Sequence, residues 1–232
     1  YFGIPYSNDM WPALRRFKCP DLPVLRDARV VDLVKTMDDQ AELCRRFTEE
    51  AVRFIRRNRE RPFFVYLPHA FVHSPRQARP QFMQHAANAT EAQIEEVDWS
   101  VGEILDCLRE EKLAQNTLVL FTSDNGGAGG CVNTPLRGGK GSVWEGGMRE
   151  PTIVWWPATI PAGTSSDEVM STMDLLPTFE KMAKAPARED SLPVDGKDIS
   201  DLLVGREGAR SPHEHFFYHQ ADKLRAVRAG RW

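Results

Sequence analysis

The residues best suited to chemistry follow an apolar run near the middle of the chain. Asp124 and Asn125 come directly after residues 117–122, in the segment Thr-Ser-Asp-Asn-Gly-Gly. A carboxylate and an amide carbonyl are hard oxygen ligands of the kind that Ca²⁺ or Mg²⁺ prefers. Lys140 follows in a Gly-Gly-Lys-Gly segment, where glycines let the backbone approach a ligand and the ammonium group suits an anion. Together these residues predict a metal-assisted anion site.

Each of these segments taken alone also has an ordinary structural interpretation. Asp-Asn-Gly-Gly is typical of a turn, and Gly-Gly-Lys-Gly is typical of a flexible loop, because Asn, Asp and Gly dominate turns for conformational reasons. The functional interpretation depends on the combination and on the apolar run that precedes it. Ligand sites in α/β sheets lie beyond the carboxyl ends of strands, which is where Asp124 and Asn125 are expected.

Hydrophobic periodicity predicts helices and strands in an α/β order. Apolar residues at helical spacing indicate helices over 36–59 and 90–112, and Thr36 with Asp39 forms a possible capping box. The acidic residues of the second helix are expected to form a solvated face, with Ile94 among the residues that point inward. Residues 174–184 predict a further helix, whose first turn tolerates proline.

Short apolar runs predict the strands, and the first 30 residues are expected to be irregular because they are rich in proline and charge. The predicted strands are 63–67, 117–122, 152–156 and 224–228. The run at 117–122 is apolar and β-branched enough for a buried strand.

Several segments, in a fixed order, resemble the catalytic domain of the sulfatase family. The matching segments are Gly-Ile-Pro-Tyr-Ser at 3–7, the strand with His-Ser-Pro at 62–75, Ser-Asp-Asn-Gly-Gly at 123–127, Arg-Gly-Gly-Lys-Gly at 137–141, Glu-Gly-Gly-Met-Arg-Glu-Pro at 145–151 and Asp-Leu-Leu-Pro-Thr at 174–178. The resemblance implies an α/β fold like that of alkaline phosphatase, with a mixed, largely parallel sheet flanked by helices. Residues 1–186 would be the C-terminal part of the catalytic domain, and 187–232 the start of a small C-terminal α+β subdomain.

The resemblance also implies roles for individual residues. His73 matches the family's active-site histidine, because His-x-Pro follows the same strand, and His73 and Lys140 would be catalytic and bind substrate. A histidine at a strand end can donate a hydrogen bond to a sulfate oxygen or protonate a leaving alkoxide, although one that merely anchors a proline-flanked loop is also typical. His69 is a further candidate for contacting substrate. Asp124 and Asn125 would bind Ca²⁺, with Mg²⁺ as the alternative.

Sulfatases resembling this chain carry a Cys-x-Pro-Ser-Arg or Ser-x-Pro-Ser-Arg segment whose first residue is oxidised to formylglycine. Neither Cys19 nor Cys131 has this context, and Cys44 and Cys107 fall in helical patterns typical of small core residues. We therefore expect a fragment of a sulfatase that is inactive alone. Two alternatives stay open: a phosphoryl hydrolase of the same superfamily, and a noncatalytic remnant that binds an anion or a metal.

Composition limits the partners. The net charge of −3 gives no basic surface for nucleic acid, and no run of 18 apolar residues is present to span a membrane. By resemblance, the substrate is a sulfated small molecule or carbohydrate, and the parent protein is exported to the periplasm, the medium or the lysosome. The histidines without motif support are His85, His213, His215 and His219, and the last three are expected to be surface residues.

Overall fold

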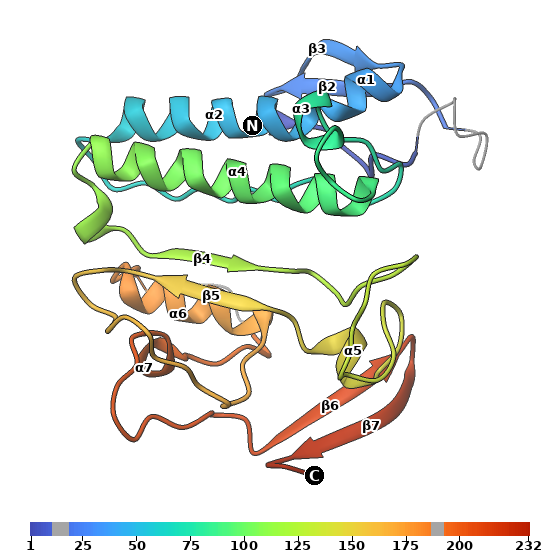
Figure 1. The fold of residues 1–232 in the computed structure, drawn as a ribbon. Helices are drawn as coiled ribbons and strands as arrows, with labels where there is room; N and C mark the ends of the chain where they lie inside the picture. Colours follow the sequence, from blue (N-terminus) through green and yellow to red (C-terminus); the bar gives the residue numbers. More distant parts are fainter. Residues whose placement is uncertain (11–18, 187–192) are drawn as a thin grey trace. The chain divides into compact units, whose positions relative to one another are not determined.

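The structure is a computed structural model that describes residues 1–10, 19–186 and 193–232. The chain divides into two compact units, Tyr1–Ala114 and Gln115–Trp232, and each is described by itself (Figure 1). The predicted boundary between residues 186 and 187 stays a prediction. None of the helices in these described parts of the chain is both long and apolar enough to cross a membrane.

The first unit opens with a small antiparallel sheet. Strands β1 (Phe2–Gly3), β2 (Leu22–Arg26) and β3 (Arg29–Val34) pair in the order β1-β2-β3. The expectation of an irregular segment over residues 1–30 was therefore wrong for β2 and β3. Leu22 and Val24 alternate with less buried neighbours and are fully buried in the core of this unit. This period of two was hidden in the sequence by Pro23 and by the flanking charges.

Four helices follow in the first unit, and two of them are long. A short helix α1 (Met37–Ala41) leads into α2 (Leu43–Asn58), and α3 (Pro80–Met83) leads into α4 (Ala89–Glu110), which lies beside α2 (Figure 1). The predicted capping box is confirmed, because Asp39 N donates to Thr36 Oγ1 at 3.1 Å and Thr36 N donates to Asp39 Oδ2 at 2.9 Å. Asn88 caps α4 through its side-chain oxygen.

The buried face of α4 differs from the predicted one. Ile94, expected to point inward, is 54% exposed, whereas Glu96, expected on a solvated face, is completely buried. The reason is that α4 packs against α2 through a polar and small-residue face, and the buried carboxylate of Glu96 is paired with Arg79. Hydrophobicity alone therefore misassigned which side of the helix is inside.

Residues 63–67 do not form the predicted strand. The segment is extended, and Phe64 and Tyr66 are 68% and 79% exposed while their neighbours are half-buried. The alternation is typical of a strand, but a strand also needs a hydrogen-bonded neighbour. Among the described residues no strand pairs with this segment.

The second unit contains two antiparallel pairs of strands. Strands β4 (Val119–Thr122) and β5 (Thr152–Trp155) confirm two predicted strands and pair with Thr122 opposite Thr152. Strand β4 is half-buried rather than buried, because Phe121 is 37% exposed. Strands β6 (His215–Gln220) and β7 (Lys223–Ala229) form a hairpin that includes the predicted strand at 224–228.

Short helices complete the second unit. After η2 (Ala114–Asn116), which spans the boundary in sequence, they are α5 (Glu145–Met148), η3 (Thr172–Asp174), α6 (Leu175–Met182) and α7 (Ser200–Leu203). Helix α6 confirms the helix predicted over 174–184. Ile199, Leu202 and Leu203 are buried with Leu120 and Val154 of the sheet.

His213 is not the surface residue that we expected. Its side chain is only 6% exposed, and its Nε2 lies 2.9 Å from both carboxylate oxygens of the fully buried Asp174. No local pattern indicates this pair, because 39 residues separate its members.

Candidate functional site

The predicted metal ligands lie where the sequence expects them, at the carboxyl end of β4. Asn125 Nδ2 donates a hydrogen bond to Asp124 Oδ1, so the two side chains are held against each other. Asp124 Oδ2 and Asn125 Oδ1 have no hydrogen-bond partner among the described residues. Two adjacent hard oxygens are thus available, and their chemistry fits Ca²⁺ or Mg²⁺.

Three glycine-rich loops meet behind these ligands. Gly126 N donates to Gly147 O at 3.3 Å, and Gly146 N donates to Arg137 O at 2.8 Å. Lys140 N donates to Gly127 O at 3.2 Å. Each of the three segments singled out in the sequence is therefore hydrogen-bonded through its backbone to another of the three.

Asn133 ties two of these loops together. Its Oδ1 accepts from Gly127 N at 3.0 Å, and its Nδ2 donates to Gly127 O at 3.0 Å and to Gly138 O at 3.1 Å. A single amide side chain thus fixes the loop that follows Asp124 and Asn125 to the loop that carries Lys140. Sequence reasoning missed this residue, and its one signal was its position between the two glycine segments.

The glycines are required because backbone meets backbone. A Cβ at Gly126 would lie 1.8 Å from Gly146 O, one at Gly139 would lie 2.6 Å from Gly127 O, and one at Gly147 would lie 2.4 Å from Gly139 O. Contacts this short do not occur, so any larger residue would push the loops apart. We call this arrangement of residues 124–127, 137–142 and 145–147 the glycine cradle.

The cradle fixes the backbone of Lys140 and leaves its side chain exposed. Lys140 Nζ has no ion-pair partner within the described parts of the chain. The hairpin of β6 and β7 supports the same loop, since Gln220 Nε2 donates to Gly141 O at 3.1 Å. A charged group on a fixed backbone is suited to binding an anion.

Glu150 is a second residue that sequence reasoning missed at this site. Burial, and then the negative charge of Asp124, raise the pKa of the Glu150 carboxyl above its ordinary value. Its Oε1 is buried without a hydrogen-bond partner among the described residues. Such a site gains from positive charge, which agrees with a cation at Asp124 and Asn125. The described residues contain no group of three or more His, Cys, Asp or Glu side chains that could hold a metal.

Glu145 and Arg149, within the Glu-Gly-Gly-Met-Arg-Glu-Pro segment, form an exposed ion pair. Arg149 Nη1 lies 3.8 Å from Glu145 Oε2, and the two side chains are 57% and 42% exposed. Glu145 also pairs with Arg228 of β7, at 3.3 Å. These surface ion pairs join the end of the cradle to the hairpin of β6 and β7, and they are not part of a buried core.

His73 lies in the first unit, on the segment between residues 63–67 and α3. Its Nδ1 lies 2.9 Å from Ser74 O. A carbonyl oxygen only accepts, so Nδ1 carries the proton and Nε2 is left for another partner. This contact sets both the orientation and the tautomer of the ring.

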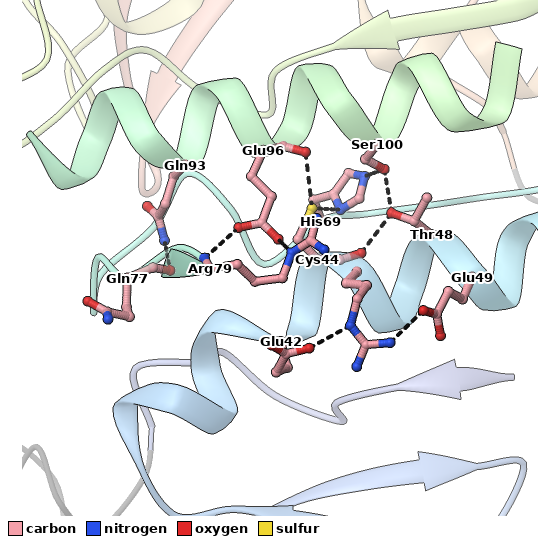
Figure 2. A network of polar contacts seen from close by, with 11 residues as sticks. Glu42, Cys44, Thr48, Glu49, His69, Gln77, Arg79, Gln93, Glu96 and Ser100 are labelled. Carbon is pink, nitrogen blue, oxygen red and sulfur yellow. Dashed lines mark hydrogen bonds and ion pairs between the residues drawn. The ribbon is translucent and has the colours of Figure 1, made fainter. Parts of the chain in front are cut away.

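His69 has a different environment from His73. Its Nδ1 lies 3.7 Å from Cys44 Sγ and its Nε2 lies 3.2 Å from Ser100 Oγ, between α2 and α4 (Figure 2). Burial lowers the pKa of the His69 imidazole from 6.5 to about 4, so the ring is neutral near pH 7. Both ring nitrogens have partners inside the first unit. The predicted contact of His69 with substrate stays a prediction.

The five predicted site residues are thus divided between the two units. Asp124, Asn125 and Lys140 belong to the glycine cradle of the second unit, where backbone hydrogen bonds join their loops. His69 and His73 share one segment of the first unit.

Comparison with known proteins gives one consistent result. The family model described as Sulfatase matches residues 3–185. Steryl-sulfatase of Homo sapiens is 38% identical over 216 residues, which cover 88% of this chain and 36% of that protein. N-acetylgalactosamine-6-sulfatase of Canis lupus familiaris is 35% identical over 247 residues, which cover 100% of this chain and 46% of that protein. The chain therefore spans less than half the length of these relatives.

Solved structures agree with the sequence relatives. The PsFucS1 sulfatase from Pseudoalteromonas sp. matches with a TM-score of 0.85 at 24% identity, over 98% of this chain and 52% of that chain. The protein Ps i-CgsB, in complex with k-i-k-neocarrahexaose, matches with a TM-score of 0.73 at 30% identity, over 85% of this chain and 45% of that chain. These neighbours confirm the predicted α/β fold class. The expected parallel pairing is not seen within the described residues, where every strand pair is antiparallel.

Proposed function

Because this chain belongs to the sulfatase family, we propose that it supplies part of an active site that hydrolyses a sulfate monoester to an alcohol and sulfate. The observation that carries this proposal is the glycine cradle. It holds two side-chain oxygens and one lysine, none of them with a partner among the described residues, on loops that are hydrogen-bonded to one another. A sulfuryl group that is being transferred is stabilised by positive charge in a fixed position, and metal ligands and a lysine on fixed loops can provide it.

Asp124 and Asn125 would hold the metal, Ca²⁺ or Mg²⁺. When bound, the metal supplies Lewis acidity, polarising sulfate oxygens and stabilising developing negative charge. The family resemblance implies a formylglycine as the nucleophile of the parent protein. In this chain, Asn133 keeps the ligand loop and the lysine loop at a fixed separation, so the metal ligands and Lys140 can act on one anion.

Lys140 would bind a sulfate oxygen and the bridging oxygen of the ester. Its ammonium group neutralises charge as the bond from sulfur to the bridging oxygen breaks. The exposed side chain has the freedom to reach the anion, while its backbone is held by Gly127 O.

His73 would protonate the leaving alcohol. The imidazolium carries a proton on Nε2, while its Nδ1–H is held by Ser74 O, so the proton is delivered from a ring of fixed orientation. Transfer of this proton to the bridging oxygen as the ester bond breaks leaves a neutral alcohol and a neutral imidazole.

The substrate would be a sulfated small molecule or carbohydrate. Relatives named for steryl and N-acetylgalactosamine-6-sulfate esters, and a neighbour whose structure holds a neocarrahexaose, support this class without choosing within it. Export of the parent protein to the periplasm, the medium or the lysosome stays part of the same proposal.

Calcium binding tests the metal part of the proposal on the 232-residue chain itself. Isothermal calorimetry is expected to detect Ca²⁺ binding that Asp124→Ala abolishes. Asp98→Ala, which removes an exposed carboxylate of α4, is the matched control and is expected to leave binding unchanged. If the unaltered chain takes up no Ca²⁺ or Mg²⁺, the metal assignment is wrong.

The reaction is tested in a catalytically active protein that carries this sequence, with aryl sulfate and aryl phosphate assayed in parallel. Sulfate hydrolysis is expected to be the faster, and Lys140→Ala is expected to lower kcat/KM for the sulfate by about 100-fold. Lys35→Ala, an exposed lysine of the first unit, serves as the control. Faster turnover of the phosphate would instead favour a phosphoryl hydrolase.

A further inference from the structure

The segment that carries His73 is attached at both of its ends to a buried polar network between α2 and α4 (Figure 2). At one end, His69 contacts Cys44 and Ser100. At the other end, Arg79 contacts Glu96 through both its backbone and its side chain. Neither contact involves the cradle residues, and the reaction as proposed uses none of these groups.

The hydrogen bonds at the His69 end have one consistent direction. Thr48 Oγ1 donates to Cys44 O at 2.7 Å, which uses its only hydrogen, so it must accept from Ser100 Oγ at 2.6 Å. Ser100 has then used its own hydrogen and must accept from His69 Nε2 at 3.2 Å. The neutral ring therefore carries its proton on Nε2, the opposite tautomer from His73.

The partners at this end are uncharged near neutral pH. Burial raises the pKa of the Cys44 thiol to about 12 and lowers the pKa of His69 to about 4. Cys44 Sγ also lies 3.6 Å from Glu96 O. Near neutral pH the Cys44 thiol therefore keeps its proton and the His69 ring is uncharged, so the contacts at this end join neutral groups.

The other end is held by a buried ion pair. Arg79 Nε donates to Glu96 Oε1 at 2.7 Å and Arg79 N donates to Glu96 Oε2 at 2.9 Å, and the two side chains are 11% and 0% exposed. The Arg79 guanidinium also lies 4.2 Å from the centre of the Trp99 ring. Removing either charge would leave the other buried and unpaired, which is costly.

Further contacts hold the chain between the two anchors. Gln93 Nε2 of α4 donates to Gln77 O at 3.3 Å, and Phe71 and Ala78 are buried. His73, by contrast, keeps part of its surface exposed. The segment is thus fixed along its length while its candidate catalytic group stays accessible.

We propose that His69 is a positioning residue, whose hydrogen bond to Ser100 holds the 69–79 segment on α4 so that His73 is presented in one orientation. This inference rests on the proposed role of His73. It assigns His69 to the support of the segment rather than to contact with the sulfate ester.

The test compares two amide substitutions that differ in reach. The amide nitrogen of glutamine occupies the place of Nε2 and can still donate to Ser100, whereas that of asparagine corresponds to Nδ1 and falls short. His69→Gln is therefore expected to behave like the unaltered protein and His69→Asn is not. Ser100→Ala removes the acceptor without changing the histidine and reports on the same contact if His69→Asn does not fold. Glu103→Gln, an exposed change on α4, is the control.

The first measurement is amide hydrogen exchange over residues 70–78 in the 232-residue chain. His69→Asn and Ser100→Ala are expected to speed exchange there by about tenfold or more, while His69→Gln and Glu103→Gln leave it within about twofold. Equal exchange in His69→Asn, Ser100→Ala and the unaltered chain would overturn the proposal. This readout does not depend on sulfatase activity.

The second measurement is kinetic, in the active protein that carries this sequence. His69→Asn is expected to lower kcat by about 10- to 100-fold with little change in KM, as for a misplaced transition-state group. In a His73→Ala background the same change is expected to have no further effect on kcat. A loss of equal size in both backgrounds would mean that His69 acts on the substrate directly, against the positioning role. If His73→Ala alone left kcat unchanged, the proposed function of His73 would be refuted. The hydrogen-exchange comparison would still show whether the bond between His69 and Ser100 holds the segment in place.

Discussion

Gly126→Ala provides the sharpest test of the glycine cradle. The added methyl carbon would lie 1.8 Å from Gly146 O, and the shortest tolerable separation is 3.0 Å, so a displacement of at least 3.0 − 1.8 = 1.2 Å is needed. Gly146 has little room to retreat, because its N donates to Arg137 O at 2.8 Å. The displacement must therefore break the bond from Gly126 N to Gly147 O, which is already 3.3 Å long.

The cost follows from these two changes. Overpacking a close contact costs about 1–3 kcal/mol, and losing a backbone hydrogen bond costs about 0.5–1.5 kcal/mol. Their sum is about 3 kcal/mol, or about 100-fold in the folding equilibrium of the second unit. Because Gly126 directly follows Asn125, we also expect Ca²⁺ affinity to fall by about 10-fold or more, as for other changes behind metal ligands.

Gly102→Ala is the matched control, since it makes the same chemical change where nothing lies within 4 Å of the added carbon. Gly102 is inside α4, so alanine is expected to stabilise the first unit by about 0.5–1 kcal/mol. For both variants, urea unfolding measures stability, hydrogen exchange over 124–147 measures local stability, and calorimetry measures Ca²⁺ affinity. If Gly126→Ala matches the unaltered chain in local stability and in Ca²⁺ affinity, the cradle is not a close-packed element.

Three further predictions concern buried groups. The pKa of His69 is about 4 in the folded chain, against an ordinary value of 6.5, so the unfolded chain binds more protons below pH 6.5. The unfolding free energy should therefore fall by about 3 kcal/mol between pH 6.5 and 4. Urea unfolding as a function of pH measures this decline, and His69→Gln should remove it. His213→Ala leaves the carboxylate of Asp174 buried without its histidine and should cost about 3 kcal/mol by thermal unfolding. Cys44, buried and with a pKa raised to about 12, should react with a disulfide reagent far more slowly than Cys131.

Each of these predictions has a control. His219→Ala removes an exposed histidine of β6 and should change stability by less than about 0.5 kcal/mol. If His213→Ala and His219→Ala lowered the unfolding free energy by similar amounts, the buried pair of His213 and Asp174 would contribute no stability of its own. A flat pH dependence in the unaltered chain would contradict the burial of His69, and equal reaction rates for the cysteines would contradict the burial of Cys44.

The elements of the fold that could be predicted are those that local sequence determines. The capping box of Thr36 and Asp39 spans three residues, and apolar spacing indicated both long helices. Strands β4 and β5 were predictable as apolar runs. The extended segment at 63–67 shows the limit of this approach, because its alternation is local while the partner that makes a strand is not.

The site was predictable only where its residues lie in recognisable segments. Asp124, Asn125 and Lys140 lie in such segments. Their position after the carboxyl end of β4 could therefore be inferred from the sequence. The contacts of His69 could not, since Cys44 and Ser100 lie 25 and 31 residues away and belong to two different helices. Composition also misled the assignment of Glu96, because a charged residue is buried only when a partner such as Arg79 is buried with it.

The glycines of the cradle meet two separate physical requirements. Gly138 and Gly141 both have φ of +83°, which favours glycine whatever the space around it, and a Cβ at Gly141 would meet nothing within 4 Å. Gly126 and Gly139 have no positive φ and are required because another loop's carbonyl lies against them. Approach of the backbone to a ligand, which the sequence suggested, is therefore not what fixes these two positions. They fix the distance between the loop of Asp124 and Asn125 and the loop of Lys140, so the glycine pattern encodes the geometry between these two loops.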